Sequence, residues 1–275
     1  MKAVIPAAGF GTRFLPLAKA IPKEMLPLGD RPVIHYVVAE AVAAGCDEIL
    51  IILGRGKEAI PAYFMPNPEL ERHLEQTGKL RELAAVQELS RFGRIHYTYQ
   101  AAMRGLGDAV RHAREFVGAD PVFAVLLGDT VMHGGSPLPA MVAAWEARRL
   151  PSVALEECPA EKVVRYGVAG GRQLAPDLFA LDRLVEKPRP EEAPRLLDEG
   201  GGPLPFHAFA ARYLLTPEIF TLLDQTQPGY GGEVQVTDAM ESLRAQRGFL
   251  GVRWPGRRLD IGHPKGLLEA AHLFA

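Results

Sequence analysis

Residues 4–27 read VIPAAGFGTRFLPLAKAIPKEMLP, in which an apolar strand runs into a glycine-containing turn. Glycine allows the tight turns and the close backbone approach through which such loops bind phosphate. A dinucleotide-binding loop needs a third glycine where this chain has Phe14, and no Gly-Lys-Ser/Thr follows as in a P-loop. Pro16, Pro22 and Pro27 exclude a single helix after the turn. We therefore predict a semi-rigid segment that covers a bound ligand.

Three cations follow the turn, at Arg13, Lys19 and Lys23. An arginine can bind two phosphate oxygens at once, whereas a lysine acts as a point charge. Ordinary surface cations would produce the same pattern, so this segment alone leaves both interpretations open. If the segment is functional, backbone N–H groups, Arg13 and Lys23 together bind a polyphosphate.

Strand-like and helix-like segments alternate along the chain around this turn. Amphipathic segments such as 32–44 and 107–116 separate short apolar runs that are rich in β-branched or aromatic residues. This alternation predicts a largely parallel sheet with helices on both faces. Beyond Pro159, shorter strands and turns predict a second subregion on the same core, and residues 65–93 predict a charged helical insertion. The expected strands lie in KAVIPAAG, DEILIILG, RIHYTYQ, PVFAVLLGD and PSVALEE.

Composition and charge narrow the possible partners. The 275 residues carry a net charge of −2, so a polyanion must be bound by a local cluster of cations, which favours a small phosphorylated ligand over nucleic acid. No apolar run approaches the roughly 20 residues of a membrane span, and no signal-like segment opens the chain. We therefore expect a cytoplasmic protein without a membrane partner. Cys46 and Cys158 have no CxxC spacing and are expected to be buried free thiols.

Carboxylates stand at the ends of two apolar strands. AVLLGDT places Asp129, and RLDIG places Asp260, at the carboxyl edge of the sheet, where open α/β sheets bind their ligands. Both are hard oxygen ligands suited to Mg²⁺, with water and phosphate oxygens completing an octahedron. An aspartate after a strand is also a common turn former or helix cap, so the pattern alone allows either role.

Two further segments offer groups for a sugar phosphate. LVEKP places Glu186, an acceptor for sugar hydroxyls, beside Lys187, a cation for phosphate, although the two could equally form a surface ion pair. GYGGEVQVTDA puts Glu233 after glycines that allow close backbone approach. In the same segment Asp238 stands near a helix start, where capping is the simpler role.

The chain lacks the motifs of covalent catalysis and of zinc catalysis. None of its four serines lies in a G-x-S-x-G elbow, and its eight histidines include no H-E-x-x-H motif. A sugar 1-phosphate attacking a nucleoside triphosphate needs neither, because a phosphate monoester with a second pKa near roughly 6 is already mostly dianionic. The protein then has to align two anions and neutralise charge as pyrophosphate leaves.

Five motifs in order make the chain resemble the bacterial UTP–glucose-1-phosphate uridylyltransferases (UDP-glucose pyrophosphorylases) of the sugar-nucleotidyltransferase superfamily. They are AAGFGTRFLPLAKAIPKEMLP, QAAMRGLGDAV, VEKP, GGEVQVTDAM and DIG, and the resemblance covers nearly the whole chain. It implies Mg²⁺-assisted transfer of a uridylyl group from UTP to glucose 1-phosphate by in-line displacement at the α-phosphorus. It also implies a Rossmann-like three-layer α/β/α fold with a mixed, mostly parallel sheet and a smaller, β-rich sugar-binding lobe. We expect one domain over 1–275, with about 1–158 as the nucleotide-binding core and about 159–275 as the sugar-binding lobe and the return to the core.

The resemblance also implies roles for individual residues. Arg13 and Lys23 would contact the triphosphate, and Lys187 the sugar phosphate, as the catalytic cations. Asp129 and Asp260 would bind Mg²⁺. The nucleotide would contact Ala7, Ala8, Gly9, Gly11, Gln100 and Gly107, with the last two reading the uracil edge, and the glucose would contact Gly167, Glu186 and Glu233.

Departures from the family pattern keep alternatives open. Ala211 stands where the family often has glycine, and its methyl group is expected to crowd a hexose or to shift the backbone that contacts it. Asp108 stands where a histidine is common.

Two alternative functions stay open. The chain could be a thymidylyltransferase or another sugar-1-phosphate nucleotidyltransferase, or it could be a non-catalytic sugar-nucleotide-binding protein. Phe14 disfavours a NAD-dependent oxidoreductase. As partners we expect the small-molecule substrates UTP and glucose 1-phosphate, and further copies of the chain in a homo-oligomer.

Overall fold

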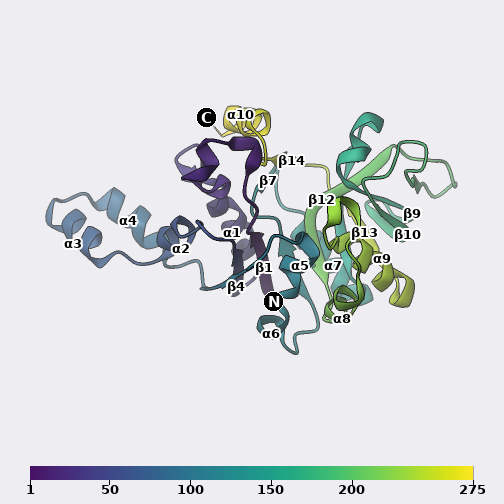
Figure 1. Ribbon diagram of the computed structural model, residues 1–275, viewed down its shortest axis with the longest axis horizontal. Helices are drawn as coiled ribbons and strands as arrows, with labels where there is room; N and C mark the ends of the chain where they lie inside the picture. Colours follow the sequence, from purple (N-terminus) through teal and green to yellow (C-terminus); the bar gives the residue numbers. More distant parts are fainter. Residues whose placement is uncertain (275) are drawn as a thin grey trace.

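A ten-stranded sheet forms the centre of the computed structural model, which describes residues 1–274 (Figure 1). Its strands follow the order β11-β9-β10-β13-β8-β12-β6-β1-β4-β5. All five strands expected in the first part of the chain are present, as β1, β4, β5, β6 and β8. The strands are β1 (Lys2–Ala7), β4 (Glu48–Leu53), β5 (Arg94–Tyr99), β6 (Phe123–Leu126), β8 (Ser152–Cys158), β9 (Gly167–Ala175), β10 (Leu178–Glu186), β11 (Leu196–Leu197), β12 (Phe206–Leu215) and β13 (Leu250–Arg253).

The sheet is mixed, with parallel and antiparallel pairings in different parts. Strand β4 runs parallel to β1 and β5, and β1 runs parallel to β6. Strand β12 runs antiparallel to β6 and β8, and β9 runs antiparallel to β10. Strands from the second half of the chain therefore lie in the same sheet as those from the first half. The predicted α/β fold with a mixed sheet is confirmed.

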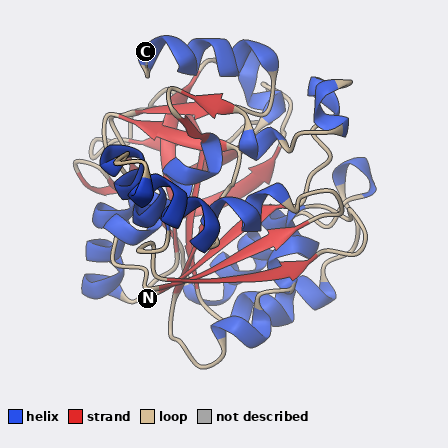
Figure 2. Cartoon of the chain, turned by 90° about the vertical axis from the view of Figure 1, so that its left-hand side faces the viewer, coloured by secondary structure: helices blue, strands red, loops and turns tan. Residues whose placement is uncertain are grey.

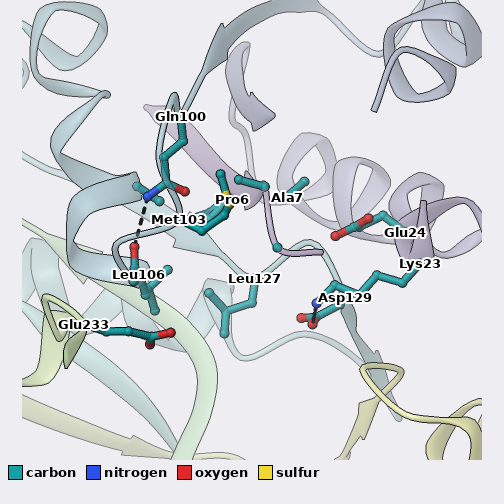
Figure 3. A pocket seen from close by; sticks show the side chains of 14 residues that line it. Pro6, Ala7, Lys23, Glu24, Gln100, Met103, Leu106, Leu127, Asp129 and Glu233 are labelled. Atoms are coloured by element: carbon teal, nitrogen blue, oxygen red, sulfur yellow. Dashed lines mark hydrogen bonds and ion pairs between the residues drawn. The ribbon is translucent and has the colours of Figure 1, made fainter. Parts of the chain in front are cut away.

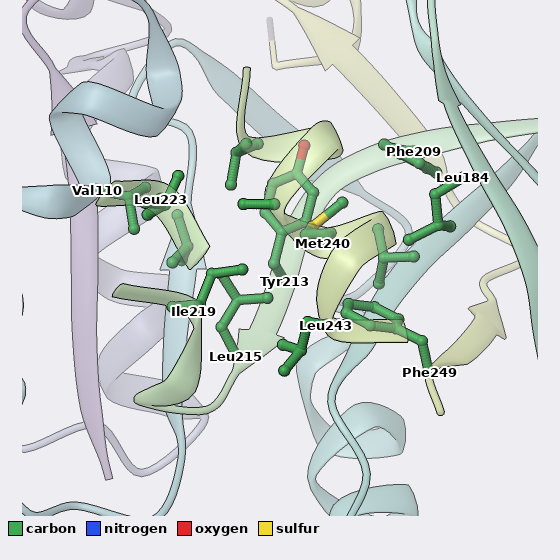
Figure 4. Packing of buried hydrophobic residues seen from close by; sticks show 14 of the residues in the cluster. Val110, Leu184, Phe209, Tyr213, Leu215, Ile219, Leu223, Met240, Leu243 and Phe249 are labelled. Atoms are coloured by element: carbon green, nitrogen blue, oxygen red, sulfur yellow. The ribbon is translucent and has the colours of Figure 1, made fainter. Parts of the chain in front are cut away.

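Helices cover both faces of the sheet, because its apolar strands bury side chains on both sides (Figure 2). Along β1, Val4 joins a core with α5, α8 and α9, whereas Ala3 and Ile5 join a second core with α1 and α7. Figure 4 shows side chains of α5, α8 and α9 packed against β12 in the first of these cores. The helices are α1 (Val33–Ala43), α5 (Leu106–Arg111), α6 (Arg114–Val117), α7 (Leu138–Arg148), α8 (Glu218–Gln225), α9 (Val236–Arg247) and α10 (Pro264–Leu273).

The proline-containing segment after β1 forms no single helix, as predicted. It folds into three short 3-10 helices, η1 (Thr12–Phe14), η2 (Leu17–Lys19) and η3 (Lys23–Met25), and two more occur at η4 (Ala160–Arg165) and η5 (Tyr230–Gly232). Two small ladders complete the strand pairing, one between β2 (Pro27–Leu28) and β3 (Arg31–Pro32) and one between β7 (Thr130–His133) and β14 (Arg257–Asp260). The second ladder joins the chain after β6 to the segment before α10.

The insertion leaves the body of the molecule as a helical arm (Figure 1). After α2 (Ala59–Phe64), the arm consists of α3 (Pro68–Gln76) and α4 (Leu80–Leu89). Leu74 is the one buried residue of α3, and the described residues of α4 include none. The charged helical insertion predicted over 65–93 is confirmed.

The two cysteines are buried and unpaired, as predicted. Burial raises the pKa of the Cys46 thiol to about 11, which makes it a poor nucleophile at neutral pH. Within residues 1–274, no helix has both the length and the apolar character needed to cross a bilayer.

Candidate active site

Two neighbouring cavities lie at the carboxyl ends of β1 and β6, the edge at which α/β sheets bind ligands. The first cavity, of about 260 Å³, is lined by the end of β1, the glycine turn, Gln100 and the start of α5 (Figure 3). The second cavity, of about 400 Å³, is lined by parts of η4, β10, β12 and α9. Leu106, Leu127, Asp129 and Glu233 line both cavities. The cavities therefore form one cleft, with Asp129 where they meet.

Asp129 and Asp260 are brought together by the ladder between β7 and β14. The Ile261 N–H donates to the Asp129 carbonyl oxygen at 2.9 Å, which joins the ends of the two segments. A Cβ atom at Gly262 would lie 3.3 Å from Asp129 Oδ2 and 2.8 Å from Asp260 Oδ1, which accepts the Gly262 N–H at 2.9 Å, so one oxygen of each carboxylate lies next to this glycine. Two carboxylates around a shared space fit Mg²⁺, which accepts a few protein oxygens and keeps waters or phosphate oxygens. No larger group of His, Cys, Asp or Glu suited to a metal occurs within residues 1–274.

Lys23 forms an ion pair with the Asp129 carboxylate. Its Nζ lies 2.5 Å from Asp129 Oδ2, and the two side chains are 15% and 23% exposed. Burial alone would lower the pKa of Lys23, but the charges of Asp129, Glu24 and Asp260 and the hydrogen bond to Asp129 together outweigh it, and the pKa is raised. Burial would likewise raise the pKa of Asp129, which Lys23 instead holds below its usual value. Both groups are therefore charged at neutral pH, and a phosphate entering the cleft meets the ammonium beside the carboxylate pair.

Gln100 has a fixed orientation in the wall of the first cavity. Its Nε2 donates to Asp108 Oδ2 at 2.8 Å and to the Gly105 carbonyl oxygen at 3.3 Å. A carboxylate can only accept, so the amide nitrogen must face Asp108, and Oε1 is left on the cavity side (Figure 3). Asp108, noted above only as a departure from the family pattern, thus sets which atom Gln100 presents to the cavity.

Two glutamate carboxylates, those of Glu186 and Glu233, line the second cavity. Glu186 Oε2 accepts a hydrogen bond from Thr237 Oγ1 at 2.6 Å, which orients the carboxylate at the end of β10. Gly167 pairs with Glu186 in the ladder between β9 and β10. A Cβ atom at Gly167 would lie 2.3 Å from the Phe209 ring and 3.2 Å from Glu186 Oε2, so only glycine fits there. Glu233 completes this wall from the segment before α9.

Arg13 and Lys187 line the second cavity from opposite sequence halves. Lys187 Nζ lies 3.6 Å from Glu186 Oε1, and its backbone has a φ of 47°, in the left-handed region. Such a conformation costs a residue with a side chain roughly 1–2 kcal/mol, and strain of this kind clusters at functional sites. Arg13 Nη1 would lie 3.9 Å from a Cβ at Gly262, the position that the two aspartates also face. The two cations and the carboxylate pair thus surround one space.

Most of the residues predicted for the site meet in this cleft. The first cavity contains Ala7, Ala8, Gly9, Lys23, Gln100, Asp129 and Glu233, and the second adds Arg13, Gly167, Glu186, Lys187 and Asp260. Gly11 and Gly107 are not among the residues that line either cavity. The Gly107 N–H donates to the Val234 carbonyl oxygen at 2.9 Å, so Gly105 and Leu106 form the wall instead. Sequence reasoning missed Glu24, Arg165 and Thr237, which also line the two cavities. Glu24 and Thr237 lie within two of the quoted motifs but were given no role, and Arg165 lies outside all five.

Ala211 stands in the second cavity with a φ of 59°, in the left-handed region. Glycine adopts this conformation without steric strain, a gain of roughly 1–2 kcal/mol that the extra freedom of glycine in the unfolded chain partly offsets. We expect Ala211→Gly to raise the free energy of unfolding by about 0.5–1 kcal/mol, and Tm by about 1–4 °C. Thermal denaturation followed by circular dichroism measures this, with Ala211→Val expected to lower Tm. A glycine variant less stable than the parent would contradict the strain.

Comparisons with known proteins identify relatives of the whole chain. The family model described as "Nucleotidyl transferase" matches residues 2–275. The UTP–glucose-1-phosphate uridylyltransferase of Pseudomonas aeruginosa is 41% identical over 274 residues, covering 98% of this chain and 94% of that protein. The Bacillus subtilis enzyme of the same name is 40% identical over 275 residues, covering 100% and 90%.

Solved structures are also similar to this chain over almost its whole length. A UDP-glucose pyrophosphorylase complexed with UDP-glucose has a TM-score of 0.86 and 35% identity, covering 99% of this chain and 97% of that chain. The UTP-bound UGPase from Acinetobacter baumannii has a TM-score of 0.88 and 35% identity, covering 99% and 92%. Both alignments therefore extend over almost the full length of this chain.

Proposed function

This chain belongs to the nucleotidyl transferase family, among the UTP–glucose-1-phosphate uridylyltransferases, and from that premise we propose that it transfers a uridylyl group from UTP to α-D-glucose 1-phosphate, releasing pyrophosphate. The observation that carries the proposal is the junction of the two cavities at Asp129 and Asp260. A nucleotide in the first cavity and a sugar phosphate in the second would meet at the carboxylate pair. That arrangement suits a displacement between two phosphorylated substrates.

The residues of the cleft would act by positioning and charge. Lys187 would bind the phosphate of glucose 1-phosphate, while Glu186 and Glu233 accept hydrogen bonds from the sugar hydroxyls. Arg13 and Lys23 would bind the triphosphate and stabilise the negative charge on the departing pyrophosphate. Mg²⁺, bound by Asp129 and Asp260, would neutralise the phosphate charge that the two anionic substrates bring together. The attacking phosphate oxygen is already ionised at neutral pH, so no side chain has to remove a proton.

The orientation of Gln100 supports a uracil ring in the first cavity. Because Asp108 and Gly105 hold Nε2, the free Oε1 can accept the N–H of a uracil ring at N3. Cytosine has an acceptor at that ring position, which would face the Gln100 oxygen without a hydrogen bond. This contact would favour UTP, or dTTP, over CTP.

Pyrophosphate release tests the proposed reaction. We would incubate the protein with Mg²⁺ and each of UTP, dTTP, CTP, ATP and GTP, pairing each with glucose 1-phosphate, galactose 1-phosphate or N-acetylglucosamine 1-phosphate. The proposal expects the highest kcat/KM for UTP with glucose 1-phosphate. Preference for dTTP would favour a thymidylyltransferase, and release with no pair at all would leave only a binding function.

Lys187→Ala is expected to raise the KM for glucose 1-phosphate by about 10- to 100-fold, because the variant loses a charge-assisted contact to the sugar phosphate. The KM for UTP should change less than threefold, by roughly 0.6 kcal/mol at most. Steady-state kinetics with one substrate varied at a time measure both constants. Lys162→Ala, which removes a cation of η4 outside the second cavity, serves as the control. Equal increases in both KM values would contradict the assignment of Lys187.

Three further parts of the proposal concern the protein as a whole. We propose that about 1–158 binds the nucleotide and about 159–275 binds the sugar, within one domain. A cytoplasmic location is proposed because UTP is available there. A homo-oligomer is proposed as well, and light scattering of the purified protein tests it.

A further inference from the structure

A third cavity, of about 600 Å³, borders the cleft at Asp260, and the reaction as described above gives it no role. Four of its eight lining residues are positively charged at neutral pH and one is a carboxylate, which gives a net charge of +3 with His263 neutral. A concave surface with such an excess of positive charge attracts polyanions. The eight residues are Arg13, Val164, Arg165, Tyr166, Lys187, Asp260, His263 and Lys265.

Three of these cations lack a carboxylate partner among residues 1–274. They are Arg13, Arg165 and Lys265, and all three side chains are exposed. Arg258, which lines the neighbouring second cavity, differs because its Nη2 lies 2.5 Å from Glu156 Oε1. An ion pair neutralises a cation in advance, whereas an unpaired cation keeps its full charge for a ligand.

Two elements far apart in the sequence bring Arg165 and Lys265 to the cavity. Arg165 is the last residue of η4, which the fully buried side chain of Val163 anchors in the core. Lys265 lies in the first turn of α10, and His263 caps this turn by accepting the Gly266 N–H at Nδ1, at 2.8 Å. The N-terminus of a helix carries a partial positive charge, which adds to that of the side chains. Both backbone segments are therefore fixed, while the two long side chains can adjust to a ligand.

The position of the cavity indicates which part of the substrates can reach it. It shares Arg13 and Asp260 with the second cavity but no residue with the first, where Gln100 would hold the base. Neither Glu186 nor Glu233, proposed to bind the sugar hydroxyls, lines it. With the base and the sugar placed elsewhere, the β- and γ-phosphates of the nucleotide are left for this cavity.

These two phosphates also need more positive charge as the reaction proceeds. When the bond between the α-phosphorus and the oxygen that bridges it to the β-phosphate breaks, the electron pair stays on that oxygen. Pyrophosphate therefore leaves with one more negative charge than the same group carried in UTP, while the sugar phosphate gives up one charge in joining the α-phosphorus. Cations placed where charge develops stabilise the transition state.

We propose that Arg165 and Lys265, together with Arg13, bind the β- and γ-phosphates of UTP and the pyrophosphate that these become. The inference rests on the proposed function and adds to it two residues that lie outside all five sequence motifs. UDP-glucose has no such group, because its second phosphate is that of the sugar. The site therefore distinguishes UTP and pyrophosphate from UDP-glucose and glucose 1-phosphate.

The test measures all four Michaelis constants, in the forward reaction and in the reverse reaction of UDP-glucose with pyrophosphate. We expect Arg165→Met and Lys265→Met each to raise the KM for pyrophosphate and for UTP by about 5- to 10-fold, because each loses one charge-assisted contact. The double variant is expected to raise both constants by about 25- to 100-fold. The KM values for UDP-glucose and glucose 1-phosphate should change less than about threefold. Circular dichroism and Tm establish that the variants are folded.

Lys162→Met is the matched control, because Lys162 is an exposed cation of the same η4 that lines neither the second nor the third cavity. It should keep all four constants. An unchanged KM for pyrophosphate in the double variant would overturn the inference. An equal increase for UDP-glucose would also overturn it, since that result would indicate a general attraction of anions to the cleft.

Failure of the proposed reaction is distinguishable from failure of this inference. If the parent protein turned over no substrate pair, calorimetry with pyrophosphate and Mg²⁺ would still measure the site. The inference then expects the double variant to bind pyrophosphate about 25- to 100-fold more weakly than the parent and Lys162→Met. A parent protein that does not bind pyrophosphate would overturn it.

Discussion

Asp129→Asn is expected to lower kcat/KM by roughly 10³-fold, about 4 kcal/mol of transition-state stabilisation, while the protein stays folded. Asparagine keeps the size and shape of the side chain, so the ladder between β7 and β14 has no reason to change. The variant loses the charge with which we propose that Asp129 binds Mg²⁺, and it leaves Lys23 without its partner at 2.5 Å. Both changes weaken the neutralisation of phosphate charge at the point where the two cavities meet.

A magnesium titration separates these two effects. Initial rates measured over increasing Mg²⁺, with UTP and glucose 1-phosphate held constant, should show a midpoint shifted to higher Mg²⁺ together with a lower plateau. Asp238→Asn makes the same chemical change at an exposed aspartate outside both cavities and should behave like the parent protein. Turnover at the parent rate across the whole titration would show that Asp129 does not bind the metal.

Arg212→Met is expected to lower the free energy of unfolding by about 3–5 kcal/mol. Arg212 is fully buried, and its Nη2 and Nε lie 2.6 Å and 3.0 Å from the oxygens of Glu40. The same guanidinium donates to the carbonyl oxygens of Thr130 at 2.8 Å and Ala211 at 2.9 Å. The variant would leave the Glu40 carboxylate of α1 without a countercharge, held only by the hydrogen bond from Ser136 Oγ at 2.7 Å, and would release the carbonyl groups of Thr130 and Ala211.

A double variant identifies the cause of this loss. Glu40→Leu/Arg212→Met removes both charges, so we expect it to recover about half or more of the lost stability. The remaining deficit would measure the hydrogen bonds to the two carbonyl groups. Denaturant unfolding followed by the fluorescence of Trp145 and Trp254, both buried, measures the three stabilities. A loss below about 1 kcal/mol for Arg212→Met would contradict the role of the pair.

Local sequence patterns predicted the strands of the core well, because a strand buried on both faces must be continuously apolar. They predicted one helix over 107–116, whereas the structure has α5 and α6 separated at His112 and Ala113. There the His112 and Ala113 N–H groups bond to carbonyl oxygens three residues back, a tighter turn than an α-helix uses. No proline or glycine marks this break, so the pattern carried no sign of it.

For the candidate site, too, the sequence indicated individual residues, whereas their contacts depend on the fold. Asp129 and Asp260 were recognisable separately, as carboxylates at strand ends, but their proximity depends on a ladder that joins segments 131 residues apart. Lys57 follows an Arg-Gly pair typical of an exposed turn, and only the fold shows that its ammonium is buried against Glu24. The orientation of Gln100 likewise depends on Asp108, whose contact arises from the position of α5 beside the end of β5.

The residue at position 262 indicates whether the two carboxylates of the site can share one space. Any side chain there would press its Cβ against Asp260 and Asp129 and turn the carboxylates away from their shared space. A protein with this fold could then still hold a nucleotide and a sugar in its two cavities, yet lack the place where charge is neutralised. In a newly sequenced genome, the residue after Asp-Ile in this motif would separate catalysts from proteins that have become sensors of the same ligands.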